Sequence, residues 1–328
     1  MESEKSIFWK DRNVLVTGAG GFIGNAVVWR MWELGARVTC VVQKSGDVTN
    51  SLPFDNKTYV AAGDVTDYYF LRDLISKREI DTIFHLAARS IVRISAKDPL
   101  STFNTNVMGT VALLEAARNV GKCRSIVVAS SDKAYGDHNI LPYTENHFLI
   151  PKNTYDTSKA CADLIAQTYH SNYGMPVSVT RCSNVYGPRD MNLSRLIPNS
   201  CIKVAEYKNP IVYSDIENME REFIFIDDVS DAYEAISRNA LVGPYNIGGN
   251  GPMKIIDVIN LICKFGGSNV SIDVVERDPE FKEILKQCID SSKLKEATGW
   301  EPKTAIEDGL EKTYYYYYNK LQEYKQYQ

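Results

Sequence analysis

The stretch that decides the fold is Val14-Leu15-Val16-Thr17-Gly18-Ala19-Gly20-Gly21-Phe22-Ile23-Gly24. A short run of β-forming residues leads into a glycine-rich turn, and apolar residues then recur at helical spacing as far as Leu34. The glycines at 18, 21 and 24 fit the spacing G-x-x-G-x-x-G. Glycines let the backbone approach a pyrophosphate closely, and the N-terminus of the following helix attracts its charge. Because a buried strand precedes the turn and an amphipathic helix follows it, we predict a dinucleotide site rather than a plain strand–helix turn.

Downstream of this segment, predicted strands alternate with predicted helices. The strands are expected at 38–42, 59–62, 82–86, 125–129 and 177–180, and the helices at 68–78, 105–119 and 155–173. This alternation predicts an α/β fold with a Rossmann-type, doubly wound parallel sheet.

The alternation of strands and helices breaks down after about Val185. The run FIFI (223–226) and the helix from Asp228 are interpreted as a return to the first lobe, and a Tyr-rich helix is expected at 313–327. We therefore expect two interleaved domains. A dinucleotide-binding domain would comprise 1–184 plus 222–248, and a smaller mixed α/β substrate domain 185–221 plus 249–328.

The composition excludes several classes of protein. A length of 328 residues suits two lobes, and a formal charge of −4 gives no basic footprint for nucleic acid. No apolar run reaches the ~18 residues of a membrane helix, and the start MESEKSIFWKDR lacks the apolar core of a secretion signal. The seven cysteines include no CxxC pair, which argues against a metal site or a disulfide framework. We expect a reduced, cytoplasmic protein with no metal, membrane or nucleic-acid partner.

Tyr155 and Lys159 lie four residues apart on a predicted helix and therefore on one face. A free tyrosine has a pKa near ~10, and a neighbouring ammonium favours the phenolate and lowers that pKa. Lys159 could also hold a nicotinamide ribose. The spacing is common by chance, but this pair follows a strand that ends in Ser130-Ser131, downstream of the glycine turn. We predict that Tyr155 exchanges a proton with an alcohol that the dinucleotide oxidises.

The preference between NAD and NADP depends on the end of the second strand. An acidic residue there would bind the ribose 2′-hydroxyl and select NAD. The chain instead reads Val42-Gln43-Lys44-Ser45, so Lys44 could accept a 2′-phosphate or lie in a solvated loop, which favours NADP only slightly. Asp64-Val65 follows the third strand, where it would meet the adenine or form a surface turn.

Several motifs resemble the extended short-chain dehydrogenase/reductase family, the NAD-dependent sugar-nucleotide epimerases and dehydratases. They are TGAGGFIG (17–24), GDVTD (63–67), HLAAR (85–89), NVMGT (106–110), ASSDKAYG (129–136), YDTSK (155–159), RCSNVYGP (181–188), REFIFIDDV (221–229) and TGWEPKTAIEDGL (298–310). The resemblance implies a Rossmann lobe, a smaller nucleotide-sugar lobe and a homodimer built from two helices of each subunit.

The resemblance also implies roles for individual residues. Ser131 would bond the sugar hydroxyl being oxidised, and Tyr155 would take its proton. The cofactor would contact Gly18, Gly21, Phe22, Ile23, Gly24, Lys44, Asp64, Val65, Leu86, Ala87, Ala88, Tyr155 and Lys159. The nucleotide sugar would contact Arg89, Ser90, Asn184, Leu196, Ile197 and Arg221. Asn184 could instead be a turn residue, and Arg221 could instead form a surface ion pair.

Asp132-Lys133 separates the subfamilies. An epimerase needs no further acid or base, whereas a 4,6-dehydratase must expel the C6 hydroxyl as water. The Ser-Asp-Lys segment resembles the UDP-N-acetylglucosamine and CDP-glucose 4,6-dehydratases, and UDP-N-acetylglucosamine is the expected substrate. Asp132 would be the acid, and Lys133 could be the C5 base if neutral. Asp132-Lys133 could instead be a solvated turn. For the whole protein, the alternatives are a UDP-hexose 4-epimerase and a dinucleotide-sensing protein that catalyses no reaction. Tyr135 would pack over the sugar or in the core.

Overall fold

The computed structural model describes residues 4–43, 52–53, 55–267, 270–276 and 284–326. Lys44 and its neighbour Ser45 lie outside these ranges.

The larger lobe contains a sheet of seven strands, all paired in parallel, in the order β10-β6-β5-β4-β1-β2-β3. The strands are β1 (Asn13–Thr17), β2 (Arg37–Val42), β3 (Thr58–Ala62), β4 (Thr82–His85), β5 (Ser125–Ala129), β6 (Val177–Cys182) and β10 (Gly243–Ile247). The strand order reverses between β1 and β4. In doubly wound sheets such a reversal opens a crevice at the carboxyl ends of the strands. The doubly wound parallel sheet predicted from the sequence is confirmed.

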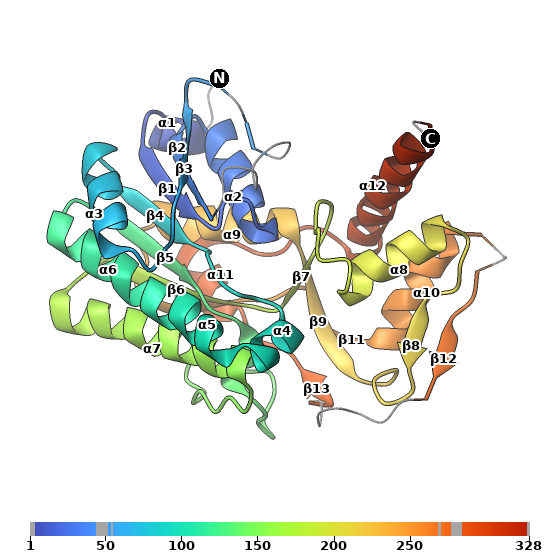
Figure 1. Cartoon of the computed structure of the whole chain (residues 1–328). Coiled ribbons are helices and arrows are strands. Elements are labelled where there is room, and N and C mark those ends of the chain that lie inside the picture. Colours follow the sequence, from blue (N-terminus) through green and yellow to red (C-terminus); the bar gives the residue numbers. More distant parts are fainter. Residues whose placement is uncertain (1–3, 44–51, 54, 268–269, 277–283, 327–328) are drawn as a thin grey trace.

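Helices cover both faces of this sheet (Figure 1). One face packs against α1 (Glu4–Trp9), α2 (Phe22–Glu33), α9 (Ile226–Arg238) and α11 (Ser292–Thr298), and the other against α3 (Tyr68–Lys77), α6 (Gly109–Val120) and α7 (Thr154–Tyr173). Val14 and Val16 belong to the first core and Leu15 to the second, as the alternation of side chains along a strand requires.

Four short helical segments follow β4 and β5. Helices α4 (Val92–Lys97) and α5 (Pro99–Phe103) lead into a π-helical stretch, Asn104–Met108, which continues as α6. A 3₁₀ turn, Asp132–Tyr135, follows β5. Wide helical turns of the π type frequently mark functional sites.

The smaller lobe has two sheets and its own core. Strands β7 (Asn184–Tyr186), β9 (Glu220–Phe225), β11 (Pro252–Lys254) and β13 (Lys286–Gln287) form one sheet, and β8 (Ile211–Tyr213) pairs with β12 (Asp273–Val275). Helices α8 (Leu196–Ala205), α10 (Ile255–Phe265) and α12 (Ile306–Gln326) pack together beside them, and α12 projects at the chain's C-terminal side (Figure 1).

The chain returns from the smaller lobe to the larger lobe at a later residue than expected. Phe223–Phe225, expected to return to the first lobe, lie in β9, which pairs with β7, β11 and β13 of the smaller lobe. The return begins with α9, which packs on α2. An apolar strand can be buried in the core of either lobe, so the apolar pattern alone does not indicate the lobe to which this strand belongs. Helix α12 also begins at Ile306 rather than at residue 313. The division into domains stays a proposal.

Among the described residues, none of the helices combines the length and the apolar character that a bilayer crossing demands.

Candidate active site

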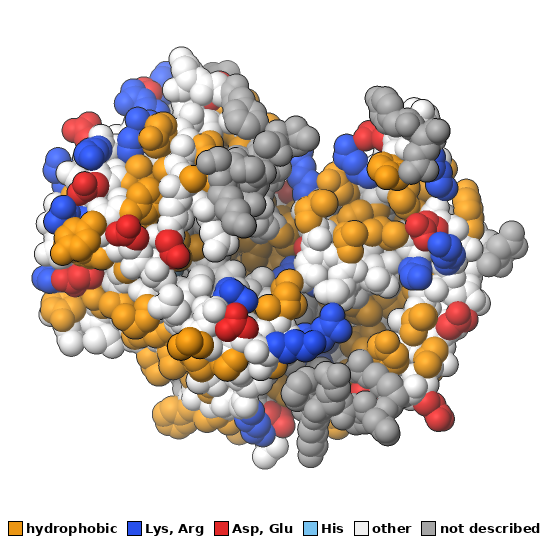
Figure 2. Space-filling view, viewed as in Figure 1, with side chains coloured by type: hydrophobic (Ala, Val, Ile, Leu, Met, Phe, Trp, Pro, Cys, Tyr) orange, Lys and Arg blue, Asp and Glu red, His pale blue; other side chains and the backbone are white. Residues whose placement is uncertain are grey.

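A cavity of about 540 Å³ lies at the carboxyl edge of the large sheet. Figure 2 shows the surface hollowed where the two lobes meet. The lining residues come mainly from the glycine turn, the ends of β2 to β6 and the first turns of α7, with single residues from the π-helical stretch, the start of α8 and α9. They are Gly18, Gly20, Gly21, Phe22, Ile23, Gly24, Val41, Val42, Gln43, Gly63, Asp64, Val65, Leu86, Ala87, Ala88, Arg89, Ser90, Thr105, Ala129, Ser130, Tyr155, Lys159, Cys182, Arg195 and Tyr233.

The glycine turn is tight enough to exclude side chains. Gly18 has φ +69°, and a Cβ there would lie 2.7 Å from the Ala87 nitrogen. A Cβ on Gly24 would lie 2.1 Å from the Gly18 carbonyl oxygen. The turn therefore brings backbone to the cavity wall at the N-terminus of the 12-residue helix α2. This geometry fits the pyrophosphate of a dinucleotide.

The structure brings together the remaining expected cofactor residues that it describes. Gln43, Asp64 and Val65 line the cavity, as do Leu86, Ala87 and Ala88. The Asp64 carboxylate already accepts hydrogen bonds from the backbone nitrogen and the hydroxyl of Thr66, both at 2.8 Å. Lys44 lies outside the described residues, so the preference between NAD and NADP stays open at this point.

Tyr155 and Lys159 both line the cavity, and both are buried. Helix α7 begins beside them because the Asn153 side chain caps it, accepting a hydrogen bond from the Asp156 nitrogen at 2.9 Å. The Lys159 ammonium donates to the Ala129 carbonyl at 2.7 Å. Burial lowers the pKa of Lys159 to about 8.

Burial raises the pKa of the Tyr155 phenol, and the charge of Arg195 opposes this rise most strongly. A hydrogen bond with Ser131 also lowers that pKa. The sequence led us to expect Lys159 as the cation that makes the phenol more acidic. In the structure Arg195 makes the leading contribution of this kind, while the Lys159 ammonium bonds the end of β5.

Asp132 is buried, with 3% of its surface exposed, so it is not the solvated turn residue of the alternative interpretation. The Ser131 hydroxyl donates to its carboxylate at 3.0 Å. Burial raises the pKa of Asp132, while the Lys133 charge and the Ser131 hydrogen bond lower it. A carboxyl group in such a place can keep its proton near neutral pH and act as an acid.

The expected substrate residues fall into two groups. Arg89 and Ser90 line the cavity, and the Arg89 guanidinium bonds Asp98 at 3.1 Å. The remaining residues, which do not line it, are Asn184, Leu196, Ile197 and Arg221.

Those four residues lie on the smaller lobe. The Asn184 amide donates to the Glu222 carbonyl at 3.0 Å. Ile197 is buried in the core of that lobe, and Leu196 packs against it. Arg221 is also buried, so it does not occupy the surface position of the alternative interpretation.

Sequence reasoning missed Arg195, which caps α8 and lines the cavity. Its guanidinium is held at 3.1 Å from Asp190, a carboxylate that is itself buried. Arg195 directly precedes the expected contacts Leu196-Ile197, and this adjacency was the signal that could have identified it.

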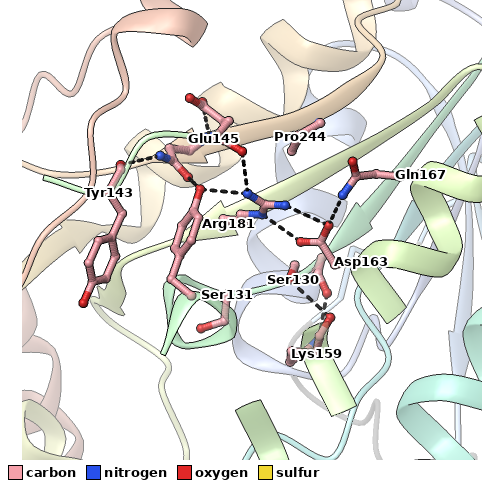
Figure 3. A network of polar contacts seen from close by, with 12 residues as sticks. Ser130, Ser131, Tyr143, Glu145, Lys159, Asp163, Gln167, Arg181 and Pro244 are labelled. Carbon is pink, nitrogen blue, oxygen red and sulfur yellow. Dashed lines mark hydrogen bonds and ion pairs between the residues drawn. The ribbon is translucent and has the colours of Figure 1, made fainter. Parts of the chain in front are cut away.

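A buried polar network fixes α7 against the turn that carries Asp132 (Figure 3). Arg181 of β6 donates to both oxygens of Asp163 on α7, at 2.8 and 3.1 Å, and to the Tyr135 hydroxyl at 2.9 Å. The Tyr135 hydroxyl donates to Asn246 of β10 at 2.7 Å. Tyr135 therefore lies in the core rather than over a substrate. An arginine within a strand that is buried throughout was the signal for such a pair.

Among the described residues, no group of three or more His, Cys, Asp and Glu side chains is arranged to hold a metal ion.

The matching family model and two of the chain's relatives carry the names of sugar-nucleotide 4,6-dehydratases. The family model of GDP-mannose 4,6 dehydratase matches residues 15–313. The chain is 30% identical over 341 residues to dTDP-glucose 4,6-dehydratase of Escherichia coli, which covers 93% of each protein. It is 32% identical over 321 residues to a trifunctional protein of Arabidopsis thaliana whose first named activity is UDP-glucose 4,6-dehydratase. That match covers 94% of this chain and 47% of the plant protein, so the chain spans about half of that relative's length.

Solved structures of two enzyme types resemble the fold. The dTDP-glucose 4,6-dehydratase of Bacillus anthracis, in complex with NAD, is 29% identical, with a TM-score of 0.83 and coverage of 95% of this chain and 98% of that one. UDP-glucose 4-epimerase of Thermotoga maritima, with UDP-glucose, is 26% identical, with a TM-score of 0.85 and coverage of 94% and 99%.

The ionisation of Glu222 on β9 makes the stability of the fold depend on pH. Glu222 is buried, and its carboxylate accepts hydrogen bonds from Ile289 at 3.0 Å and Gly251 at 3.3 Å. Burial raises the pKa of Glu222 from 4.5 to about 7, and the charge of Asp132 adds to the rise. The folded protein therefore binds this proton more tightly than the unfolded chain does.

The contribution of Glu222 to stability is complete below about pH 4.5 and is lost as pH rises to about 7, by up to about 3 kcal/mol. Glu222→Gln mimics the protonated form, so its free energy of unfolding should fall less than that of the wild type between about pH 5 and 7. Urea unfolding of both proteins across this range measures the difference. Identical pH profiles for the two proteins would contradict the prediction.

Proposed function

Because the chain belongs to the extended short-chain dehydrogenase/reductase family of NAD-dependent sugar-nucleotide epimerases and dehydratases, we propose that it is a nucleotide-sugar 4,6-dehydratase. The observation that carries the proposal is the buried carboxyl group of Asp132, bonded to Ser131 beside the Tyr155 phenol. A protonated carboxyl group at this position can protonate the C6 hydroxyl, which then leaves as water. Epimerisation has no use for such a group.

The coenzyme would be held by the glycine turn, by the walls at Asp64-Val65 and Leu86–Ala88, and by Lys159 at the nicotinamide ribose. When bound, NAD or NADP would accept hydride from the sugar C4 and return it to C6, so that it is regenerated in each turnover. The named relative of known structure that carries NAD supports NAD as the first choice. NADP remains the second choice, because Lys44 and Ser45 could accept its 2′-phosphate.

Tyr155 is the base that takes the proton of the C4 hydroxyl, and Ser131 bonds the same oxygen. The base is the ionised form of the buried phenol, and the charge of Arg195 is the largest effect that favours this form. Lys159, which lines the same cavity, adds positive charge there, holds α7 to the end of β5 and would contact the nicotinamide ribose.

Asp132 is the acid of the second step. Oxidation at C4 acidifies the C5 proton, a base removes it, and Asp132 protonates the departing C6 hydroxyl, which leaves as water. Lys133 could be that base only when neutral. Otherwise its charge orients Asp132 or stabilises the enolate, since it already acts on the Asp132 carboxyl.

The substrate we propose is UDP-N-acetylglucosamine, on the resemblance of the Ser131-Asp132-Lys133 segment, and the product is a UDP-4-keto-6-deoxy sugar. Arg89, Ser90, Asn184, Leu196, Ile197 and Arg221 remain the proposed contacts, with Arg195 added. CDP-glucose is the next candidate. The named relatives act on dTDP-glucose and UDP-glucose, so glucose nucleotides belong in the test. A UDP-hexose 4-epimerase is the second function, favoured by the structural likeness to the Thermotoga enzyme.

A panel of UDP-, CDP-, GDP- and dTDP-sugars, incubated with the purified protein and examined by mass spectrometry, tests the activity. We expect UDP-N-acetylglucosamine to lose the mass of one water molecule. A product of unchanged mass with inverted C4 would establish epimerisation instead. An unchanged substrate throughout the panel, with coenzyme bound, would contradict enzymatic function.

Two variants separate the proposed roles. Tyr155→Phe should lower kcat by at least about 10²-fold while the coenzyme stays bound, because only the base of the first step is lost. Asp132→Asn should still oxidise C4 and then stall before water leaves, so that reduced coenzyme accumulates and absorbs in the near ultraviolet. Full activity of Tyr155→Phe, or normal turnover of Asp132→Asn without that absorbance, would overturn the corresponding role.

We also propose that the protein forms a homodimer and works in the cytoplasm. Leu100, Met108 and Leu164 are exposed apolar side chains on α5, the π-helical stretch and α7, which pack together. Such a patch suits a symmetric contact between two copies. All seven cysteines are unpaired thiols, which supports a reducing compartment.

The dimer can be tested at Leu164, whose side chain is 55% exposed. Leu164→Glu should give a monomer in light scattering coupled to size exclusion, because a charge would be buried at the contact. Ile7→Glu, on the equally exposed surface of α1, is the control and should stay dimeric. A dimeric Leu164→Glu variant would place the contact elsewhere, and a monomeric wild type would refute the dimer.

A further inference from the structure

Three buried side chains form a line of hydrogen bonds under the cavity wall. Thr17 ends β1 and His85 ends β4, where the two residues are register partners, and Thr110 lies in α6. The Thr17 hydroxyl oxygen lies 2.7 Å from Nδ1 of His85. Nε2 of the same ring lies 3.2 Å from the Thr110 hydroxyl oxygen.

The surroundings of Thr17 determine the direction of the first bond. Its hydroxyl oxygen accepts hydrogen bonds from the backbone nitrogens of Leu86 and Ala87, both at 3.2 Å, and the Leu86 nitrogen is shared with the Thr17 carbonyl, also at 3.2 Å. A hydroxyl has two acceptor lone pairs and one proton to donate. With its lone pairs occupied by these donors, Thr17 must donate its proton to Nδ1 of His85.

The surroundings of Thr110 determine the direction of the second bond. The Thr110 hydroxyl donates to the Asn106 carbonyl at 2.7 Å, so its only proton is already used. Nε2 of His85 must then be the donor to Thr110. The Thr110 contact requires a proton on Nε2 and the Thr17 contact requires Nδ1 to be without one, so the two ends together require a neutral imidazole. Burial, with the charge of Lys159, lowers the pKa of His85 to about 3, in agreement with this neutral form.

The line ends at two parts of the proposed active site. At one end, Leu86 and Ala87 line the cavity, and Ala87 lies so close to Gly18 that no side chain fits between them. At the other end, the Asn106 side chain accepts from the Arg89 nitrogen at 2.7 Å and donates to the Ser158 hydroxyl at 2.8 Å. The Ser158 hydroxyl donates in turn to the Tyr155 carbonyl at 2.7 Å.

We propose that His85, as the neutral Nε2–H form, is a positioning residue that orients the Thr17 and Thr110 hydroxyls and so holds the Leu86–Ala87 wall at the correct distance for a bound dinucleotide. The proposal rests on the dinucleotide site of the proposed function, but not on the reaction or the sugar. His85 does not touch the coenzyme. It acts through Thr17, whose hydroxyl holds the two backbone nitrogens of the wall.

The first test is the protonation state of His85 in the full chain. The protein has four histidines, so ¹⁵N labelling of histidine gives a simple spectrum, and His85→Gln identifies the signal of residue 85. We expect the nitrogen shifts of a neutral ring protonated on Nε2, unchanged between about pH 6 and pH 8. A ring protonated on Nδ1, or a charged ring in this range, would overturn the proposal.

The second test compares matched variants by calorimetric titration with NAD and with NADP. Thr17→Val keeps the shape and removes the hydroxyl, so the dissociation constant of the preferred dinucleotide should rise at least about tenfold. Thr17→Ser keeps the hydroxyl and should stay within about twofold of the wild type. Thr110→Val and Thr110→Ser provide a second matched pair if Thr17→Val fails to fold.

Equal affinities of the Val and Ser variants would refute the positioning role. Neither test uses a sugar nucleotide, so a failure of the proposed dehydration leaves both tests intact. A chain that binds no dinucleotide would refute the proposed function, and the NMR measurement would still decide the state of His85.

Discussion

The site depends on one buried cation, the ammonium of Lys159. An ammonium removed from water is costly unless it is bonded, and the bond it finds is the last carbonyl of β5, Ala129. This bond ties the start of α7 to the carboxyl edge of the sheet. Tyr155, one turn earlier, then comes to lie in the cavity. Further along the helix, the buried pair of Arg181 and Asp163 ties α7 to β6. The position of the phenol follows from these attachments.

The proposed chemistry divides between two acidic groups in different surroundings. Burial raises the pKa of the Tyr155 phenol, and the charge of Arg195 is the largest effect that opposes this rise. Asp132 is buried beside Ser131, and its burial favours retention of a proton. The phenol must therefore be ionised with the help of a nearby cation before it takes a proton in the proposed first step, whereas the carboxyl group is suited as it stands to deliver one in the second. The paired environments, more than either residue alone, distinguish a dehydratase from an epimerase on the same fold.

The sequence was sufficient for six of the seven strands of the larger sheet, which are local runs of β-forming residues, and for most of the cavity, but it did not predict β10. It was insufficient for the smaller lobe, where strands of two to six residues pair with distant segments, and Phe223–Phe225 were therefore assigned to the wrong sheet. Arg195 was missed although it directly precedes the expected contacts Leu196-Ile197. The line from Thr17 to Thr110 could not be predicted, because its hydrogen bonds join residues far apart in the chain, which no local pattern records.

The central claim is that one electron pair leaves C4 of the sugar and returns to C6 of the same molecule. UDP-N-acetylglucosamine carrying deuterium at C4 tests it directly, with the product examined by NMR and mass spectrometry. The account predicts a 4-keto-6-deoxy product with the deuterium at C6 and no net reduction of the coenzyme. Deuterium retained at C4, or lost entirely to water, would contradict it.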